Sequence, residues 1–304
     1  MIILYHNVFP DCESPEFWWA GQAMRFTVFK RHILWLAKNH RIVSLDEYLS
    51  NDRKTRLGER KPVAITFDDG LQLTFKCVST FLVDKNIPAT FFVPTSHLEH
   101  GELLWFSYLD ALCTENPYDS ITVNGHIYTF QTLALCKQAK YTLTLLAKQS
   151  GNPVGFCKNI AKTYPIPGKI ASKYEGMTYD QLMDVGRSNV LKIGAHTITH
   201  PFLDRLPKNS QAREILDGKK ILTELTGEPV RYFAYPGGEY NLETVELVKA
   251  AGFDASFAII PKDLGMDPKW EIARVGIYSE SLLKLQMKTM GVAALVRQVG
   301  LRVG

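Results

Sequence analysis

Long hydrophobic runs, paired cysteines and an export signal are all missing from this chain of 304 residues. It has no stretch of 18 or more apolar residues, so we expect no membrane-spanning helix. Residues 1–5 are too short for the apolar core of a signal peptide and run directly into His6. The five cysteines are odd in number, scattered and in no C-x-x-C pair. Together these absences predict a cytoplasmic protein with reduced thiols.

Negative charge is missing from two segments. Residues 121–174 contain seven lysines and no Asp or Glu, and residues 281–304 are also basic without an acid. The first segment is either a solvated face or a dock for an anionic group, such as the phosphate of an activated sugar or a lipid headgroup. The second predicts a basic amphipathic helix that docks on the rest of the protein or lies on an anionic membrane face.

What the chain does have is an alternation of short apolar runs with helical patterns. With 46% apolar and 22% charged residues it is a globular chain. The alternation covers residues 1–95 and 178–280 and indicates a parallel sheet with crossover helices. We predict an α/β protein with a distorted (β/α)7-type barrel related to the TIM barrel. Seven runs are the candidate barrel strands: 1–8, 63–67, 89–93, 190–195, 231–235, 255–259 and 272–277.

The alternation stops between residues 96 and 177. This segment predicts an insert on the barrel rim, with helices at 105–112 and 133–148 and a hairpin that turns on Asn124-Gly125. The histidines of this segment, His97 among them, are interpreted as structural.

Two polar clusters follow predicted buried strands. Asp68-Asp69-Gly70 follows residues 63–67, and His196 and His200 follow residues 190–195. Carboxyl ends of parallel strands meet at one barrel mouth, where such sites usually lie. If residues 196–200 form a helical turn, both imidazoles face the same way. Two histidines and one carboxylate form a metal site that leaves positions open for water and substrate.

With these motifs the sequence resembles the polysaccharide deacetylases of the NodB homology type, carbohydrate esterase family four. The acid motif at 66–70 matches the first family motif and 196–201 the second. Residues 233–238 are similar to a variant of the third, and 252–257 to the fourth.

The resemblance implies a role for each matched residue. It implies that Asp69, His196 and His200 bind a divalent metal and that Asp68 is the general base that activates the attacking water. In the third motif it implies that the N–H of Gly237 stabilises the oxyanion. Tyr235 and Pro236, in the same motif, are candidate substrate contacts. The metal is most simply Zn²⁺, but the ligand set also accepts iron, cobalt, nickel or manganese.

The chain departs from the family pattern at two places. Ala234 stands where the family carries an arginine that orients the base, and no histidine follows His200 to act as general acid. Arg274 is either a replacement that reaches the base from the last strand or part of a surface ion pair. His6 is either the missing acid, a substrate contact or a hydrogen-bonded core histidine.

The sequence therefore predicts a metal-dependent hydrolase that removes an N-acetyl group from an amino sugar during surface-polysaccharide or glycan biosynthesis. The expected substrate is a nucleotide- or lipid-linked sugar that bears phosphate, handled in the cytoplasm or at the inner membrane face, with no nucleic-acid partner. Three alternatives remain open at this point. They are a deformylase of a lipid-linked formamido sugar, a catalytically dead glycan-binding protein, and an amidohydrolase of a non-sugar amide.

Overall fold

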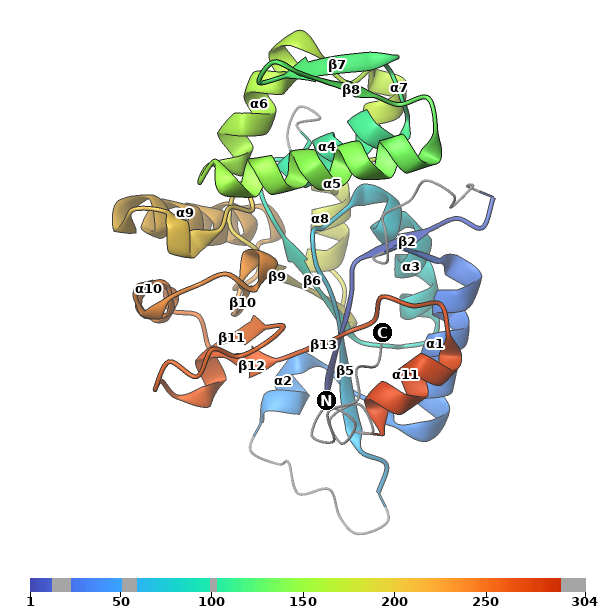
Figure 1. Ribbon diagram of the computed structural model, residues 1–304. Helices are drawn as coiled ribbons and strands as arrows, with labels where there is room; N and C mark the ends of the chain where they lie inside the picture. Colours follow the sequence, from blue (N-terminus) through green and yellow to red (C-terminus); the bar gives the residue numbers. More distant parts are fainter. Residues whose placement is uncertain (13–22, 51–58, 99–102, 291–304) are drawn as a thin grey trace, which may run out of the picture.

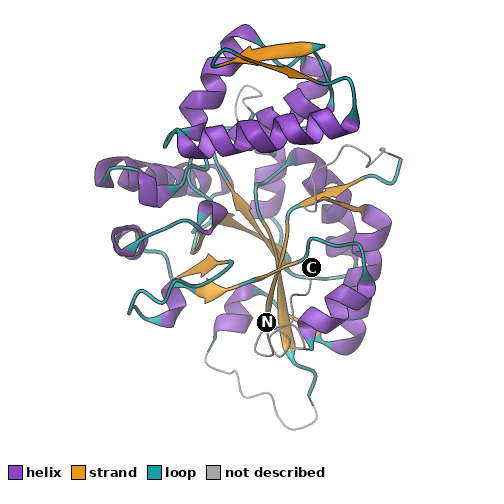
Figure 2. Ribbon diagram, viewed as in Figure 1, coloured by secondary structure: helices purple, strands orange, loops and turns teal. Residues whose placement is uncertain are grey.

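The computed structural model describes residues 1–12, 23–50, 59–98 and 103–290. Its central feature is a parallel sheet surrounded by helices, drawn in Figure 1 and coloured by element type in Figure 2. The strands in sheet order are β12 (Ile272–Ala273), β11 (Ala255–Ala258), β10 (Tyr232–Ala234), β9 (Leu191–Ala195), β6 (Ala89–Val93), β5 (Pro62–Phe67), β1 (Ile2–Tyr5) and β13 (Val275–Gly276). A further strand, β4 (Arg41–Ile42), pairs with β5.

The two edge strands of this sheet, β12 and β13, are consecutive in the sequence, because only Arg274 separates them. β12 pairs with β11 and β13 pairs with β1, so the sheet nearly closes into a barrel. If β12 and β13 are counted as one position, the barrel has the seven strand positions that the sequence predicted. The α/β barrel fold is therefore confirmed.

β1, β6, β10 and β11 are buried along their whole length, and β5 is buried from Val63 to Phe67, which matches the apolar runs of these strands. The helices around the barrel are α1 (Phe26–Asn39), α2 (Leu45–Leu49), α3 (Gln72–Asp84), α8 (Tyr179–Gly186), α9 (Lys208–Thr226), α10 (Leu242–Ala250) and α11 (Leu282–Thr289). The predicted cap at Thr178 is confirmed as a capping box that begins α8. Gly227, with φ 69°, ends α9 as expected.

The first and last predicted strands are each interrupted. Residues 1–8 form β1 and then β2 (Asn7–Phe9), which leaves the barrel and pairs with β3 (Ala23–Arg25). His6 lies at the first interruption and Arg274 at the last. We predicted residues 1–8 and 272–277 as single strands, so the sequence analysis missed both breaks. Each break falls at a polar residue.

Residues 103–177 form a separate layer above the carboxyl ends of the strands (Figure 1). It consists of α4 (Trp105–Thr114), β7 (Ser120–Val123), β8 (His126–Thr129), α5 (Leu133–Gln149), α6 (Pro153–Thr163) and α7 (Gly168–Ala171). The hairpin turn at Asn124-Gly125 is confirmed, since both residues have positive φ. α6 and α7 were not predicted. The layer has its own apolar cluster, which also takes in Phe202 from a barrel loop.

The described part of the basic tail packs on the barrel. Leu285 of α11 belongs to the main core, and the Lys288 ammonium donates to the Gly276 carbonyl at 2.6 Å. The rest of the predicted tail helix lies outside the described residues. Among the described helices, none combines the length and the apolarity needed to cross a membrane.

Candidate active site

The acid turn lies directly after β5. Asp69 and Gly70 both have left-handed backbones, with φ of 70° and 55°. A Cβ at Gly70 would lie 2.8 Å from Val93, so the turn needs glycine for space as well as for conformation. A left-handed Asp is a strained choice that other contacts must maintain. This turn brings both carboxylates to the barrel mouth, where Asp68 and Asp69 are each 5% exposed.

The histidine loop follows β9. Our expectation of a helical turn between His196 and His200 is wrong, because this segment is irregular and Thr197 and His200 have left-handed backbones. Glu214 of α9 holds the loop by accepting the N–H groups of Ile198 and Thr199, both at 2.8 Å. The imidazoles meet through this tight turn and not through helical periodicity.

Asp69, His196 and His200 form one buried cluster whose ligand atoms all lie within 4.8 Å of one another. Asp69 Oδ1 is 3.8 Å from His196 Nε2 and 3.5 Å from His200 Nε2. His196 Nδ1 lies 2.8 Å from the Ala234 carbonyl, which orients the ring and leaves Nε2 for the cluster.

The residues of this cluster fit a divalent cation. Burial, and then the neighbouring Asp68, raises the pKa of Asp69 well above its usual value. Burial lowers the pKa of His196 and of His200, so both rings favour the neutral form that binds metals. Two buried carboxyl groups face one buried guanidinium here, and a cation held by Asp69 would take the place of the proton that its raised pKa favours.

Arg274 binds Asp68 with both arms of its guanidinium. Nη1 donates to Oδ1 at 2.6 Å and Nη2 to Oδ2 at 2.7 Å. Burial alone would raise the pKa of Asp68, but the charges of Arg274 and His196 outweigh it and lower that pKa to about 2. The pair is buried, so the structure places Arg274 against Asp68 and not in the alternative surface ion pair.

His6 lies at the same mouth, at the break between β1 and β2. Burial lowers its pKa to about 4, with opposing contributions from Asp68 and Arg274. Its ring centroid is 5.6 Å from that of Tyr278, whose side chain folds across Gly276. The sequence interpretation missed Tyr278. The sequence indicates Tyr278 only through its position four residues after Arg274. That spacing is informative only when Arg274 is already known to lie at the barrel mouth.

The third motif forms a tight turn after β10. Gly237 has φ 61°, and a Cβ there would lie 2.8 Å from Phe202. Pro236 is buried in the same turn. The Tyr235 hydroxyl is 2.8 Å from Ser256 Oγ and donates to the Trp270 carbonyl at 2.9 Å, so this side chain is part of the core. A substrate contact by Tyr235 would have to come from its backbone, and that contact stays a prediction.

The upper layer contributes an aromatic wall that the sequence did not reveal. Trp105 Nε1 donates to the His200 carbonyl at 3.0 Å, and the Phe106 ring centroid is 4.8 Å from that of His200. Phe202 packs on Trp105 at 5.8 Å between ring centroids. The adjacent aromatic pair at 105–106 was visible in the sequence, but its partner was not.

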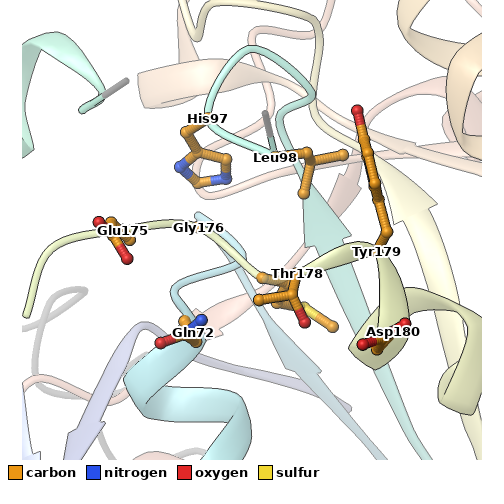
Figure 3. Close-up of a pocket in the computed structure, with 9 residues that line it drawn as sticks. Gln72, His97, Leu98, Glu175, Gly176, Thr178, Tyr179 and Asp180 are labelled. Atoms are coloured by element: carbon orange, nitrogen blue, oxygen red, sulfur yellow. The ribbon is translucent and has the colours of Figure 1, made fainter. Parts of the chain in front are cut away.

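A pocket of about 380 Å³ lies between the start of α3 and the start of α8 (Figure 3). His97, Gln72, Glu175 and Asp180 are among its lining residues. The Gln72 N–H donates to the Glu175 carbonyl, so the pocket borders the chain that leaves the acid turn. We interpreted His97 as structural. It is 2% exposed, and neither ring nitrogen has a hydrogen-bond partner among the described residues.

A family model for polysaccharide deacetylases matches residues 56–151 and 157–256. These segments make up more than half of the chain, so the chain belongs to the polysaccharide deacetylase family. The match runs through part of the region that we interpreted as an insert, and the boundaries 96–177 stay a prediction.

Among curated protein sequences, the chain is 26% identical over 187 residues to the putative polysaccharide deacetylase YxkH of Bacillus subtilis. That match covers 52% of this chain and 66% of the relative, just under two thirds of its length. Among solved structures, the Streptococcus pyogenes deacetylase PplD in complex with acetate has a TM-score of 0.61 at 16% identity, covering 95% of this chain and 96% of that one. IcaB from Ammonifex degensii has a TM-score of 0.55 at 17% identity, with 95% and 97% covered. At these identities the likeness of the structures shows the fold alone.

Proposed function

We propose that this chain is a metal-dependent N-deacetylase that hydrolyses the acetamido group of an amino sugar in glycan biosynthesis. One observation carries the proposal. A buried Asp69–His196–His200 cluster stands beside a second carboxylate, Asp68, that Arg274 holds in its ionised form. The family membership supports the reaction class.

Asp69, His196 and His200 would hold the metal, most simply Zn²⁺. When bound, such an ion supplies Lewis-acid chemistry, because it polarises an amide carbonyl and lowers the pKa of water.

The other residues have separate tasks. Asp68 takes a proton from the attacking water at a carboxylate oxygen, while Arg274 fixes the plane of that carboxylate. The Gly237 N–H donates to the oxyanion that forms when the water adds to the carbonyl carbon. The C–N bond then breaks as its nitrogen receives a proton, which gives acetate and a free amine.

Two groups are candidates to deliver that last proton, namely Asp68 and His6. Because the pKa of His6 is about 4, its ring is neutral near pH 7 and acts as an acid only after it has received a proton within the site. We keep His6 as the proposed acid for two reasons. It stands at the mouth beside Asp68, and its Nδ1 has no hydrogen-bond partner among the described residues.

The pocket beside His97 is the proposed place for the sugar ring next to the reacting amide. The carboxylates of Glu175 and Asp180 and the side-chain amide of Gln72 offer it both donors and acceptors for hydroxyl groups. The catalytically dead alternative is not favoured, because Asp68 and all three candidate ligands are present and close together. The acetate bound to the related PplD fits an acetyl substrate.

The test is acetate release from N-acetylated chitooligosaccharides by the metal-loaded protein. Asp68→Asn should lower kcat by roughly 10²–10⁴-fold with unchanged metal content. Asp263→Asn is the matched control, since it replaces an exposed carboxylate whose φ of 54° suits Asn. Formamido and acetamido sugars assayed side by side separate a deformylase from a deacetylase. Full activity in Asp68→Asn would overturn the assignment of the base.

A further inference from the structure

A second cavity, of about 490 Å³, lies inside the upper layer and not in the barrel. Its size falls within the range of small-molecule sites. Most of its lining is apolar, and two lysines complete it. The lining residues are Leu103, Trp105, Tyr108, Val154, Cys157, Lys158, Ala161, Lys162, Pro165, Ile166 and Ala171.

Trp105 joins this cavity to the active site. Its indole lines the cavity, and its N–H is the donor to the His200 carbonyl. The next residue, Phe106, packs its ring against the His200 imidazole. A molecule held in the cavity is therefore one side chain away from the loop that carries two candidate metal ligands.

Two lysines of the upper layer have acidic partners within the layer. Lys140 forms an ion pair with buried Asp110, and Lys173 with Glu115, so acids of the α4 region balance these two lysines. Of the seven lysines between residues 121 and 174, Lys158 and Lys162 line the cavity. They lie four residues apart on α6, so both point to one side of the helix, and both are exposed at the cavity rim.

An apolar interior with two ammonium groups at its rim is complementary to a molecule with a hydrocarbon chain and an anionic head. We propose that this cavity holds the chain of a lipid phosphate to which the amino sugar is attached, with the phosphate at Lys158 and Lys162. This inference rests on the proposed function, because it places the attached sugar at the Asp69–His196–His200 cluster. It narrows the expected substrate from nucleotide- or lipid-linked to lipid-linked.

The first experiment measures binding without catalysis. Decyl phosphate, kept below its micelle concentration, is titrated into the full-length protein by calorimetry, with decanol and inorganic phosphate as the two half-ligands. We expect saturable binding of decyl phosphate, at least ten times weaker binding of either half, and a roughly fourfold loss of affinity for each methylene removed from the chain.

Two variants locate that binding. Lys162→Glu should weaken decyl phosphate at least tenfold, whereas the same charge change at Lys137, exposed on α5 and outside the cavity, should not. Ala161→Trp fills the cavity and should abolish binding. If Ala161→Trp does not fold, the comparison of Lys162→Glu with Lys137→Glu decides.

The second experiment separates this inference from the proposed function. The substrates are N-acetylglucosamine linked through phosphate to a ten-carbon isoprenyl chain and an unlinked N-acetylated oligosaccharide. Lys162→Glu should raise KM for the lipid-linked substrate at least tenfold and leave KM for the oligosaccharide unchanged.

The outcomes separate the two assignments. If the protein releases acetate from the oligosaccharide but binds no decyl phosphate, the lipid assignment falls and the deacetylase stands. If it binds decyl phosphate and cleaves no amide, the deacetylase assignment falls. If this cavity binds a nucleoside diphosphate sugar but not decyl phosphate, the lipid assignment is overturned as well.

Discussion

The barrel and the layer above it meet at His200 but are built in different ways. The barrel joins strands far apart in sequence, and its candidate catalytic groups lie where strands end or break. The upper layer folds from consecutive helices and one hairpin around its own apolar cluster. In our assignment the barrel supplies the chemistry, while the upper layer supplies a wall and a cavity. Changes in the two regions should therefore have different consequences.

The largest expected effect is in the barrel, at the metal cluster. Asp69→Ala removes the only carboxylate among the three candidate ligands. We expect acetate release to fall by at least about 10³-fold, because the ion is proposed to supply several kcal/mol of transition-state stabilisation. Dialysis against a chelator should do the same, and added Zn²⁺ should restore the rate. Lys137→Glu in the upper layer is the control, and a chelated protein at full activity would contradict the metal assignment.

Arg274→Ala should have the next largest effect, and mainly on stability. It leaves the Asp68 carboxylate buried without its partner, which typically costs about 3–5 kcal/mol. Urea unfolding measures this loss, and kcat should fall with it. Arg274→Lys keeps the charge but not the two-armed contact, so its stability and kcat should lie between those of the wild type and Arg274→Ala. Equal stability of all three proteins would mean that the buried pair contributes nothing.

His97 lies where the barrel meets the upper layer and should make stability depend on pH. Burial, and then the charge of His196, lowers the pKa of His97 to about 3, against roughly 6.5 in an unfolded chain. The unfolded state therefore binds the proton first. The stabilising contribution is complete above about pH 6.5 and is lost as the pH falls toward 3, at up to about 1.4 kcal/mol per pH unit.

His97→Asn removes this group and should flatten the fall in unfolding free energy between pH 6 and pH 4. His126→Asn, on the exposed hairpin, is the matched control and should keep the wild-type slope. The same slope in both variants would show that the pKa of His97 does not differ between the folded and unfolded states.

The smallest effect should come from the wall. Trp105→Phe keeps an aromatic ring but removes the donor to the His200 carbonyl. We expect a loss of about 0.5–1.5 kcal/mol in stability and a two- to tenfold fall in kcat, because one buried hydrogen bond no longer positions the histidine loop. Trp35→Phe on α1 is the control. If kcat is unchanged in Trp105→Phe, the wall only excludes water and does not position the loop.

Sequence reasoning succeeded where the pattern is local. Buried strands such as 89–93 have continuous apolar runs, and the acids and histidines follow such runs directly, so both the barrel and the meeting of the two clusters were predictable. It failed where the spacing had two physical explanations. Four residues between His196 and His200 suit a helix, but left-handed residues and Glu214 produce the same convergence without one.

In the upper layer the sequence predicted the hairpin and the helices α4 and α5, but it did not predict α6 or α7. It also predicted no contact between this layer and the barrel. Lysines that look alike in sequence differ in the fold. Lys173 has an acidic partner in Glu115, whereas Lys162 lines an apolar cavity. The difference depends on which residues of α4 lie opposite each lysine.

By itself, the sequence determined the barrel, the two polar clusters and the family, because these follow from strand-length apolar runs and the residues at their ends. Only the tertiary structure decided that Arg274 reaches Asp68, that His6 lies at a strand break, and that Trp105 joins a cavity to the loop of His196 and His200. Such contacts join residues far apart along the chain, and no periodicity within one segment records which distant side chain packing will bring next to it.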